Sequence, residues 1–597
     1  MSGFRSLSDF LADLERRRDL KRVAREVDPA FEVTEIACRE ARGEGPALLF
    51  EKVRGARFPL AVNVLAARRR IEWALGRTPG AVGAEIEELF HALPRLSPAD
   101  LWSARGSAGR VLAMRPKEVG SGPAQQVAAE ADLAPLPNLQ LWPKDGGRFV
   151  TAGLVLTEHP VERTRNLGIY RMHLYDARTT GMHWQIGKGG GFHYHEAEKR
   201  DLPLEVAVSV GADPALLLAA IAPLPEGIDE LAFAGFLRGS PTRLARARTL
   251  ALRVPADAEF VLEGVVPPRE RRDEGPFGDH FGHYSHAAPF PVFHLRTITH
   301  RARPIYQASV VGKPPQEDKF MGEAVQEMFT GVLKVIHPEI RDLWAYFEAG
   351  FHNLLVVAVE NRFEREARKT ALGLLGTGQL SLTKAVVLVD GDVNPRDRAA
   401  VFGAIARHFD PAEDFLLLPG VPLDTLDFTS FTMNLGSKMV IDAQSHARRA
   451  GSAGGAGAPP AAAVPPASVP DPRAFVPQVR AHRLAWGALL VVQVPGEGRA
   501  AVEALVRRPE YTGVRLIVAV SEDVPLEDDT LLLWGIFTRF DCARDIVPAA
   551  TESRGAWLAV RGPLGIDATW KRGYPEPVGT PAEVVARVNG WWGKAER

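Results

Sequence analysis

The chemistry that this sequence offers centres on one arginine and two acids. Arg171 lies in a strand-like run among aromatic residues, ahead of a glycine-rich stretch. Its planar guanidinium suits a carboxylate or a phosphate. Glu274 and Asp279 flank a Gly-Pro turn in the segment DEGPFGDH. Two carboxyl groups near an arginine can differ in pKa, so that one is ionised while the other delivers a proton. The same residues also fit an exposed strand arginine and an acidic surface turn.

A second set of residues suits an anion and a hard metal ion. Two strand-like runs joined by a turn at Asp176–Gly181 predict a hairpin, whose second strand is Met182–Ile186. The hairpin ends in the glycine loop Gly187-Lys188-Gly189-Gly190-Gly191, which could hold backbone amides and a lysine near an anion. Asn166 and Glu230 offer an amide oxygen and a carboxylate to a divalent ion. The alternative is a hairpin with a flexible loop.

Histidines are frequent near these segments, but none has a zinc-binding spacing. Most of them are expected to be ordinary strand or loop residues: His173, His183, His193, His195, His280, His283 and His286.

Composition narrows the class of protein. The chain has 597 residues, a net charge of −1 and two distant cysteines, Cys38 and Cys542. A balanced charge argues against a nucleic-acid partner, and the absence of a long apolar run argues against stable membrane insertion. The cysteines are expected to be buried thiols in a reducing compartment, so the predicted location is cytoplasmic. The basic run Arg68-Arg69-Arg70 is expected on a helix surface.

The elements that must position these residues divide the chain into several parts. The fold class is α/β, with an α+β character, because dense short strands in the middle of the chain are flanked by alternating strands and helices. The predicted parts are an N-terminal α/β region (1–130), a central strand-rich catalytic domain (131–300), a C-terminal α/β domain (301–447), a flexible Gly/Ala/Pro linker (448–474) and an appended α/β repeat (475–597).

The appended part is a partial copy of the preceding α/β domain. Three pairs of segments match in the same order and with similar gaps: Asp392-Val393 with Asp523-Val524, Phe409-Asp410 with Phe540-Asp541, and Ile441-Asp442-Ala443 with Ile566-Asp567-Ala568. Two copies of one unit that pack together or form part of an oligomer interface are the simplest account. Pro563 stands where the first copy has Lys438, so a role for that charge is expected only in the first copy.

The chain resembles the UbiD-type decarboxylases. The ordered motifs LPNLQLWPKDGG, NLGIYRM, ELAFAGFLRG, VPADAEFVLEG, EGPFGDHFGHY and LGSKMVIDA carry the resemblance across about residues 5–445. The resemblance implies a split-barrel flavin-binding domain between the N-terminal region and a dimerising C-terminal α/β domain. It implies prenylated FMN as cofactor, a flavin prenyltransferase as its supplier, an aromatic or α,β-unsaturated carboxylic acid as substrate, and a homodimer or higher homo-oligomer.

Residue by residue, the resemblance implies the following roles. Arg171, Glu274 and Asp279 match the catalytic arginine and acids, where the arginine steadies the substrate carboxylate and an acid supplies the proton. The predicted cofactor-binding residues are Asn166, Leu167, Gly168, Ile169, Tyr170, Arg171, Lys188, Glu230 and Lys438.

The metal site departs from the family pattern at one position. Asn166 and Glu230 match ligands of a divalent ion, Mn or Mg, beside the flavin phosphate, and a potassium ion is a further expectation. Gly187 stands where relatives have a third, histidine ligand. Lys188 could neutralise the phosphate directly, and His193 or His195 could reach back to the ion.

The expected activity is non-oxidative decarboxylation. The motif TTGMHWQ and the appended domain look like the menaquinone-pathway branch, which acts on a naphthoate carboxylate. Two alternatives remain open. One is a carboxylase that runs the reverse reaction on a phenolic or heteroaromatic compound, and the other is a non-catalytic flavin-binding or scaffold paralogue.

Overall fold

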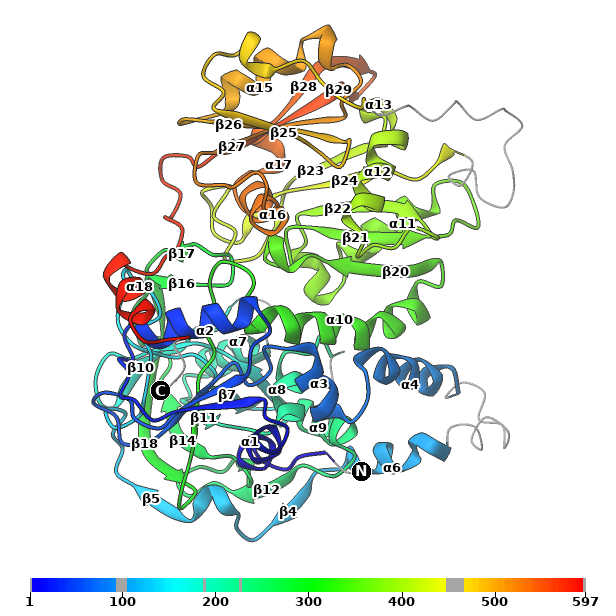
Figure 1. Cartoon of the computed structure of the whole chain (residues 1–597). Coiled ribbons are helices and arrows are strands. Elements are labelled where there is room, and N and C mark those ends of the chain that lie inside the picture. Colours follow the sequence, from blue (N-terminus) through cyan, green and yellow to red (C-terminus); the bar gives the residue numbers. More distant parts are fainter. Residues whose placement is uncertain (1–2, 93–104, 186–188, 225–227, 447–465, 594–597) are drawn as a thin grey trace. The chain divides into compact units, whose positions relative to one another are not determined.

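The computed structural model describes residues 3–92, 105–185, 189–224, 228–446 and 466–593 (Figure 1). The chain divides into two compact units. The first unit comprises Met1–Phe329 together with Glu576–Arg597, and the second comprises Thr330–Pro575. The last residues of the chain therefore belong with its N-terminal half. The predicted domain boundaries remain a prediction, and most of the predicted linker lies outside the described residues.

The N-terminal part of the first unit is a small mixed sheet with helices. Its strand order is β1-β2-β3-β19, in which β1–β2 and β3–β19 are parallel and β2–β3 is antiparallel. Helix α1 begins where the Ser6 side chain accepts a hydrogen bond from the Asp9 amide, as an N-cap should. The strands are β1 (Leu20–Val23), β2 (Ala47–Phe50), β3 (Leu60–Val62) and β19 (Tyr306–Gln307), and the helices are α1 (Leu7–Arg16), α2 (Glu32–Arg42), α3 (Arg68–Leu75), α4 (Pro79–Ala92) and α6 (Arg105–Ala113).

The basic run at the start of α3 matches the prediction of a helix surface at Arg68, which is exposed, and differs from it at Arg70, which is buried. Arg70 has no exposed area, and its Nη1 lies 3.0 Å from Asp19 Oδ2 and 2.7 Å from the Gly45 carbonyl oxygen. Arg69 also binds Asp19, while Arg68 reaches Glu327. A carboxylate and a carbonyl oxygen thus compensate part of the desolvation of this buried arginine.

The core of the first unit is a larger antiparallel sheet. Its path is β10-β18-β14-β11-β7-β8, and β15 and β5 also pair with β18. All of these pairings are antiparallel, as short strands joined by turns predict. Its strands are β5 (Val127–Ala129), β7 (Leu154–Glu158), β8 (Arg165–Ile169), β10 (Thr179–Gly181), β11 (Leu204–Val210), β14 (Phe260–Val266), β15 (Arg271–Glu274) and β18 (Ala288–His300). The mixed helix-and-sheet class is confirmed, whereas closure into a split barrel remains a prediction.

Smaller elements flank this sheet. The remaining strands are β4 (Lys117–Val119), β12 (Arg243–Arg246) and β13 (Arg253–Pro255) in one sheet, β6 (Phe149–Val150) with β9 (Met172–His173), and β16 (Phe277–Gly278) with β17 (Tyr284–Ser285). The helices are α7 (Gly189–Lys199), α8 (Pro214–Ala220), α9 (Glu230–Arg238) and, at the C-terminus, α18 (Ala582–Asn589).

The predicted hairpin with a glycine loop is wrong in two places. The second strand is β10, which ends at Gly181, so Met182–Gln185 is not a strand. Gly189, Gly190 and Gly191 form the first turn of helix α7 instead of a loop. A Cβ at Gly189 would lie 2.6 Å from Asn166 Nδ2, and one at Gly190 would lie 2.7 Å from Trp184 Nε1. The glycines therefore serve the close approach of the helix start to the neighbouring strand.

The second unit contains two five-stranded sheets with the same strand order. The first sheet is ordered β20-β21-β22-β24-β23 and the second β25-β26-β27-β29-β28. In each, the three middle strands are parallel and the two outer strands antiparallel. The strands are β20 (Ile340–Ala345), β21 (Leu355–Val359), β22 (Ala385–Asp390), β23 (Phe415–Pro422), β24 (Leu435–Asp442), β25 (Ala481–Ala485), β26 (Leu489–Val494), β27 (Leu516–Ser521), β28 (Ile546–Arg554) and β29 (Trp557–Ala568).

Corresponding helices accompany the two sheets. In chain order they are α11 (Glu366–Leu374), α12 (Arg398–His408) and α13 (Pro411–Asp414) among the strands of the first sheet, and α15 (Arg499–Val506), α16 (Asp529–Phe537) and α17 (Cys542–Asp545) among those of the second. The short helices α13 and α17 each contact the other sheet, at β29 and β24. Helix α10 (Glu317–Ile336) spans the division between the units. The two sheets share one hydrophobic cluster. This agreement supports the predicted internal repeat, which remains a prediction.

Two further expectations can be compared with the structure. Cys38 and Cys542 are both free and buried, as predicted. Among the described residues, no helix combines the length and apolar character that crossing a membrane requires.

Candidate active site

Arg171 and Glu274 form a buried ion pair. Arg171 lies between β8 and β9, and Glu274 is the last residue of β15. The Arg171 Nε donates a hydrogen bond of 2.8 Å to Glu274 Oε1, and the two side chains are 10% and 0% exposed. A charge-assisted bond of this kind fixes both groups in a site of low dielectric. The structure thus brings together two of the three predicted catalytic residues.

His183 also contacts Glu274, which the sequence did not indicate. Its Nδ1 lies 3.0 Å from Oε1 and 3.2 Å from Oε2 of Glu274, and its ring centre lies 4.3 Å from that of Phe290. The histidine is 91 residues away in sequence and lies just beyond the end of β10. No local motif could have identified it, because only the pairing of β10 and β15 with the same strand, β18, brings the two segments together.

These contacts determine the ionisation of Glu274. Burial alone would raise the pKa of its carboxyl group, but the charges of Arg171 and His183 and their hydrogen bonds outweigh burial and hold the pKa at about 2. Glu274 is therefore a carboxylate at neutral pH. It must take up a proton during a reaction before it can donate one.

Asp279 begins the turn of a short hairpin beside this pair. The hairpin strands are β16 and β17, and Asp279 follows β16 directly. Arg171 contacts both strands, because its Nη2 donates to Ser285 Oγ at 3.1 Å and its guanidinium carbon lies 4.7 Å from the centre of the Phe277 ring. Asp279 is 4% exposed, and its Oδ1 accepts a hydrogen bond of 2.8 Å from the Phe281 amide. The third predicted catalytic residue therefore lies on the element that Arg171 contacts.

Asp145 holds the first strand of this hairpin. Its Oδ1 accepts a hydrogen bond of 2.8 Å from the Gly278 amide, and its Oδ2 accepts bonds from the Leu141 and Trp142 amides. Burial raises the pKa of Asp145 to about 7, although these amides and Arg171 oppose the shift. The predicted catalytic hairpin is thus tied to the segment before β6.

Asn166 and Glu230, the predicted metal ligands, lie next to each other. The Asn166 Nδ2 donates to Glu230 Oε1 at 3.1 Å, and the Leu167 amide donates to Glu230 Oε2 at 3.0 Å. Glu230 opens helix α9, which Asp229 caps by accepting from the Leu231 amide. Burial raises the pKa of Glu230 to about 7. A nearby cation would favour its ionised form.

The two histidines that could reach back to this pair have other surroundings. His193 Nδ1 lies 2.9 Å from Thr157 Oγ1, and burial and His159 lower the pKa of His193 to about 4. His195 is exposed. Gly187 and Lys188 lie outside the described residues, within which no cluster of three or more His, Cys, Asp or Glu side chains could hold a metal ion. Asn166 and Glu230 thus fit a hard divalent ion as two oxygen ligands, with further ligands to come from the flavin phosphate or water.

The predicted flavin-contacting segment runs beside the start of α7. It comprises Asn166, Leu167, Gly168, Ile169, Tyr170 and Arg171, most of it in strand β8. The Tyr170 hydroxyl donates to Asn166 Oδ1 at 3.3 Å, and the Gly190 amide donates to the Tyr170 oxygen at 3.4 Å. The first turn of a helix presents backbone N–H groups and a positive dipole end to a phosphate. The helix start beside Asn166 and Glu230 therefore fits a flavin phosphate bound with its metal ion.

Lys438 belongs to the second unit. It lies in β24, where its Nζ donates to the carbonyl oxygens of Ser381 and Thr383. Burial lowers the pKa of Lys438 to about 8. Its contact with the cofactor remains a prediction.

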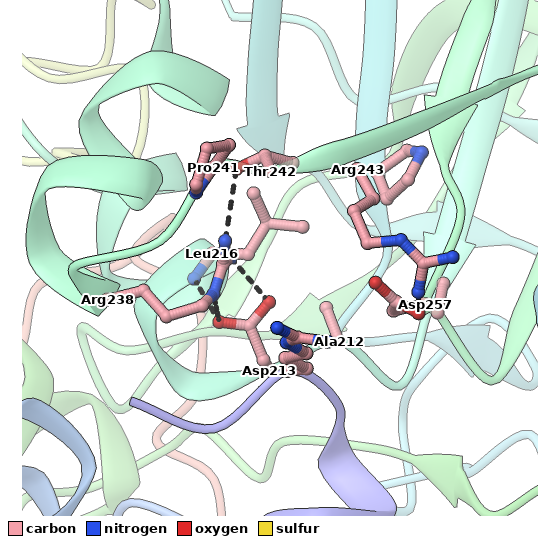
Figure 2. A pocket seen from close by; sticks show the side chains of 11 residues that line it. Ala212, Asp213, Leu216, Arg238, Pro241, Thr242, Arg243 and Asp257 are labelled. Carbon is pink, nitrogen blue, oxygen red and sulfur yellow. Dashed lines mark hydrogen bonds and ion pairs between the residues drawn. The ribbon is translucent and has the colours of Figure 1, made fainter. Parts of the chain in front are cut away.

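A small polar pocket in the first unit is separate from these residues. Arg5, Arg243 and Asp257 line it together with the buried pair Arg238–Asp213 (Figure 2). Arg238 donates to both Asp213 oxygens, at 3.1 and 2.8 Å. Because Arg238 and Asp213 neutralise each other, we interpret this pair as structural support for α8 and α9.

Family models match most of the chain. The N-terminal domain model of 3-octaprenyl-4-hydroxybenzoate carboxy-lyase matches residues 11–90, the Rift-related domain model matches 117–314, and the C-terminal domain model matches 319–443. The second sheet of the second unit lies beyond these ranges.

Individual proteins give the same result. The chain is 36% identical to a 4-hydroxybenzoate decarboxylase component of Chlamydia pneumoniae over 571 residues, which cover 95% of this chain and 94% of the relative. The solved vanillic acid decarboxylase of Sedimentibacter hydroxybenzoicus matches with a TM-score of 0.66 and 25% identity, over 74% of this chain and 93% of that one. The UbiD-class enzyme HmfF of Pelotomaculum thermopropionicum, solved with FMN, matches with a TM-score of 0.62 and 28% identity, over 74% and 94%.

Three findings indicate the same family: the order of the three matched domains, the match to a relative over nearly its full length, and the fold. The chain belongs to the UbiD family of carboxy-lyases.

Proposed function

We propose that this protein is a prenylated-FMN-dependent decarboxylase of an aromatic or α,β-unsaturated carboxylic acid. The observation that carries the proposal is the buried cluster of Arg171, Glu274 and His183. The family and its structures, one of them an evolved HmfF solved with prenylated FMN, indicate the cofactor. The flavin, when bound, supplies the electron sink that loss of CO2 requires.

Arg171 is suited to orient the substrate carboxylate. Its Nε and Nη2 are engaged by Glu274 and Ser285, while its Nη1 has no hydrogen-bond partner among the described residues. A donor left in this position can bind an incoming carboxylate without breaking the ion pair. The neighbouring Phe277 ring and buried surroundings exclude water, which strengthens the interaction.

Two acids are candidates for the proton that replaces CO2. Glu274 is ionised in the resting site, so it would accept a proton from solvent or from its neighbour His183 and then deliver it. Asp279 lies on the adjacent hairpin and is the alternative donor. In either case, the role of the chain is to hold the substrate and to store the proton close to the reacting carbon.

Asn166 and Glu230 would hold a divalent ion that binds the flavin phosphate, with the start of α7 beside it. Mn²⁺ or Mg²⁺ suits their hard oxygen ligands. We further propose a naphthoate carboxylate of menaquinone biosynthesis as substrate. This choice rests on the resemblance to the long branch of the family, whereas the relatives named above act on 4-hydroxybenzoate and vanillate.

The test is release of CO2 by protein produced together with a flavin prenyltransferase. The purified protein is characterised by absorbance and mass spectrometry and then assayed with a panel of naphthoates, hydroxybenzoates and acrylates. Glu274→Gln serves as the matched control, since it should keep the flavin absorbance and abolish turnover. Turnover at the wild-type rate in this variant would remove Glu274 from the mechanism. Bicarbonate-dependent carboxylation of a phenol, without decarboxylation, would favour the reverse reaction.

A further inference from the structure

A segment near the end of the chain, residues 576–578, packs on the hairpin that carries Asp279. The Tyr284 amide donates to the Glu576 carbonyl at 3.0 Å, and the Val578 amide donates to the Gly282 carbonyl at 3.0 Å. His283 and Pro577 form an antiparallel bridge between these two bonds. Residues 576–578 thus run alongside residues 282–284 and form a short bridge beside the pair β16–β17. All of these residues belong to the first unit.

Side chains also hold residues 576–578 against the hairpin. Val578 is 2% exposed and covers Gly278, where a Cβ would lie 2.6 Å from Val578 Cγ1 and 2.2 Å from Trp142 Cδ1. The backbone just before Asp279 is therefore held between Trp142 and Val578, with no room for a side chain. Lys144 lies 2.5 Å from Glu576 and also donates its amide to the Tyr284 hydroxyl at 3.2 Å.

The segment is anchored at its far end on the N-terminal region. Helix α18 packs against α2, as Figure 1 shows. Val584 and Val588 of α18 are buried, and the Trp592 Nε1 donates to Glu40 Oε1 at 2.9 Å. The Lys21 ammonium lies 3.8 Å from the centre of a Trp592 ring. A hydrophobic face together with a cation–π contact fixes the end of the chain independently of the hairpin.

We propose that Glu576, Pro577 and Val578 are a positioning segment of the active site, which fixes the hairpin of Asp279 and Ser285 against Arg171. The proposal rests on the proposed function, because it assigns these residues a part in the same site. A two-residue strand pair is weak by itself, and a segment that joins it by two backbone hydrogen bonds and a buried side chain stabilises it. The chain beyond the second unit is then required for full activity of the first.

The test compares two identical changes at buried positions of the C-terminal segment. Val578→Ala removes the contact with Gly278, whereas Val588→Ala removes a similar contact in the α18 anchor that does not touch the hairpin. In the flavin-free chain, amide hydrogen exchange of peptides covering 277–285 should become faster in Val578→Ala only. In the loaded enzyme, Val578→Ala should lower kcat about tenfold or more and change KM less than about twofold, because a small misplacement of a catalytic group lowers the rate of the chemical step.

Two outcomes would overturn the proposal. Exchange of 277–285 as slow in Val578→Ala as in the wild type would show that the segment does not hold the hairpin. Faster exchange with an unchanged kcat would show that holding the hairpin does not position the catalytic groups. Failure of the proposed function would be recognised differently, since the loaded wild type would then release no CO2 from any acid. The exchange comparison would still decide whether the C-terminal segment orders the hairpin.

Discussion

Replacement of Arg171 by methionine tests the electrostatic organisation of the candidate active site. Arg171 is the largest favourable influence on the ionised form of Glu274, and burial acts in the opposite direction. The displacement of the Glu274 pKa from 4.5 to about 2 corresponds to roughly 3 kcal/mol of net stabilisation. The contributions of Arg171 and His183 together are larger, because they also compensate burial. Loss of one partner of a buried ion pair typically costs about 3–5 kcal/mol, and we expect this magnitude for Arg171→Met at pH 7.

The dependence on pH has a definite sign. Since the pKa of Glu274 is lower in the folded chain than in the unfolded chain, its contribution is present above pH 4.5 and is lost as the pH falls toward 2. In Arg171→Met the burial of Glu274 is uncompensated, so its pKa rises and the carboxyl group is protonated at a higher pH. The difference in stability between wild type and variant should therefore be smaller at pH 4 than at pH 7.

The assay is local amide hydrogen exchange of the flavin-free chain, read on peptides that contain β8 and β15 and corrected for intrinsic exchange rates. A local measurement is needed because a chain of two units does not unfold in one step. Adding Glu274→Gln to Arg171→Met should recover part of the loss. A double-mutant cycle should give a coupling of at least about 2 kcal/mol at pH 7, and a coupling below about 0.5 kcal/mol would refute the reasoning.

Two further predictions concern other residues of the first unit. Gly189→Ala should lower flavin loading, because the added Cβ would lie 2.6 Å from Asn166 Nδ2. The control is Gly43→Ala, whose Cβ meets nothing within 4 Å and should leave loading unchanged. Equal flavin absorbance in the two variants would contradict the role given to the start of α7. Arg238→Met should destabilise the first unit by roughly 3–5 kcal/mol, because Asp213 is left buried without its partner. Amide exchange of α8 measures this loss. Flavin loading of the folded variant should match that of the wild type.

The sequence predicted the chemical groups of the candidate site better than it predicted the residues and elements around them. Arg171 and Glu274 were candidates because a guanidinium among aromatic residues and an acid beside a Gly-Pro turn suit this chemistry. The family motifs, rather than these contexts alone, favoured them over surface positions, and the structure does bring them into contact. His183 was expected to be an ordinary residue. Its contact with Glu274 arises because strands that are far apart in sequence come together in the fold. The run Arg68-Arg69-Arg70 was expected on a surface, yet Arg70 is buried, because composition does not reveal that Asp19 will lie beside it.

The prediction of a glycine loop was wrong for a related physical reason. A run such as Gly189-Gly190-Gly191 predicts a loop on conformational grounds, because glycine weakens a helix by roughly 1 kcal/mol per residue relative to alanine. The structure uses the missing side chains instead to bring the start of α7 close to Asn166 and Trp184. Packing against a neighbouring strand thus outweighs local propensity, and a single sequence carries no signal of that packing.

The C-terminal segment shows where reasoning from local patterns must fail. An internal repeat could be predicted from the sequence, because two stretches of similar length share the same order of residues. Residues 576–578, however, form a bridge with residues near 283, nearly three hundred positions earlier. Closing such a large loop costs only a few kcal/mol of chain entropy, since the cost grows with the logarithm of loop length. The buried side chains of Val578, Val584 and Val588 together with the Trp592–Glu40 bond are enough to offset a cost of that size. The end of a long chain can therefore become part of a site that residues of its first half define.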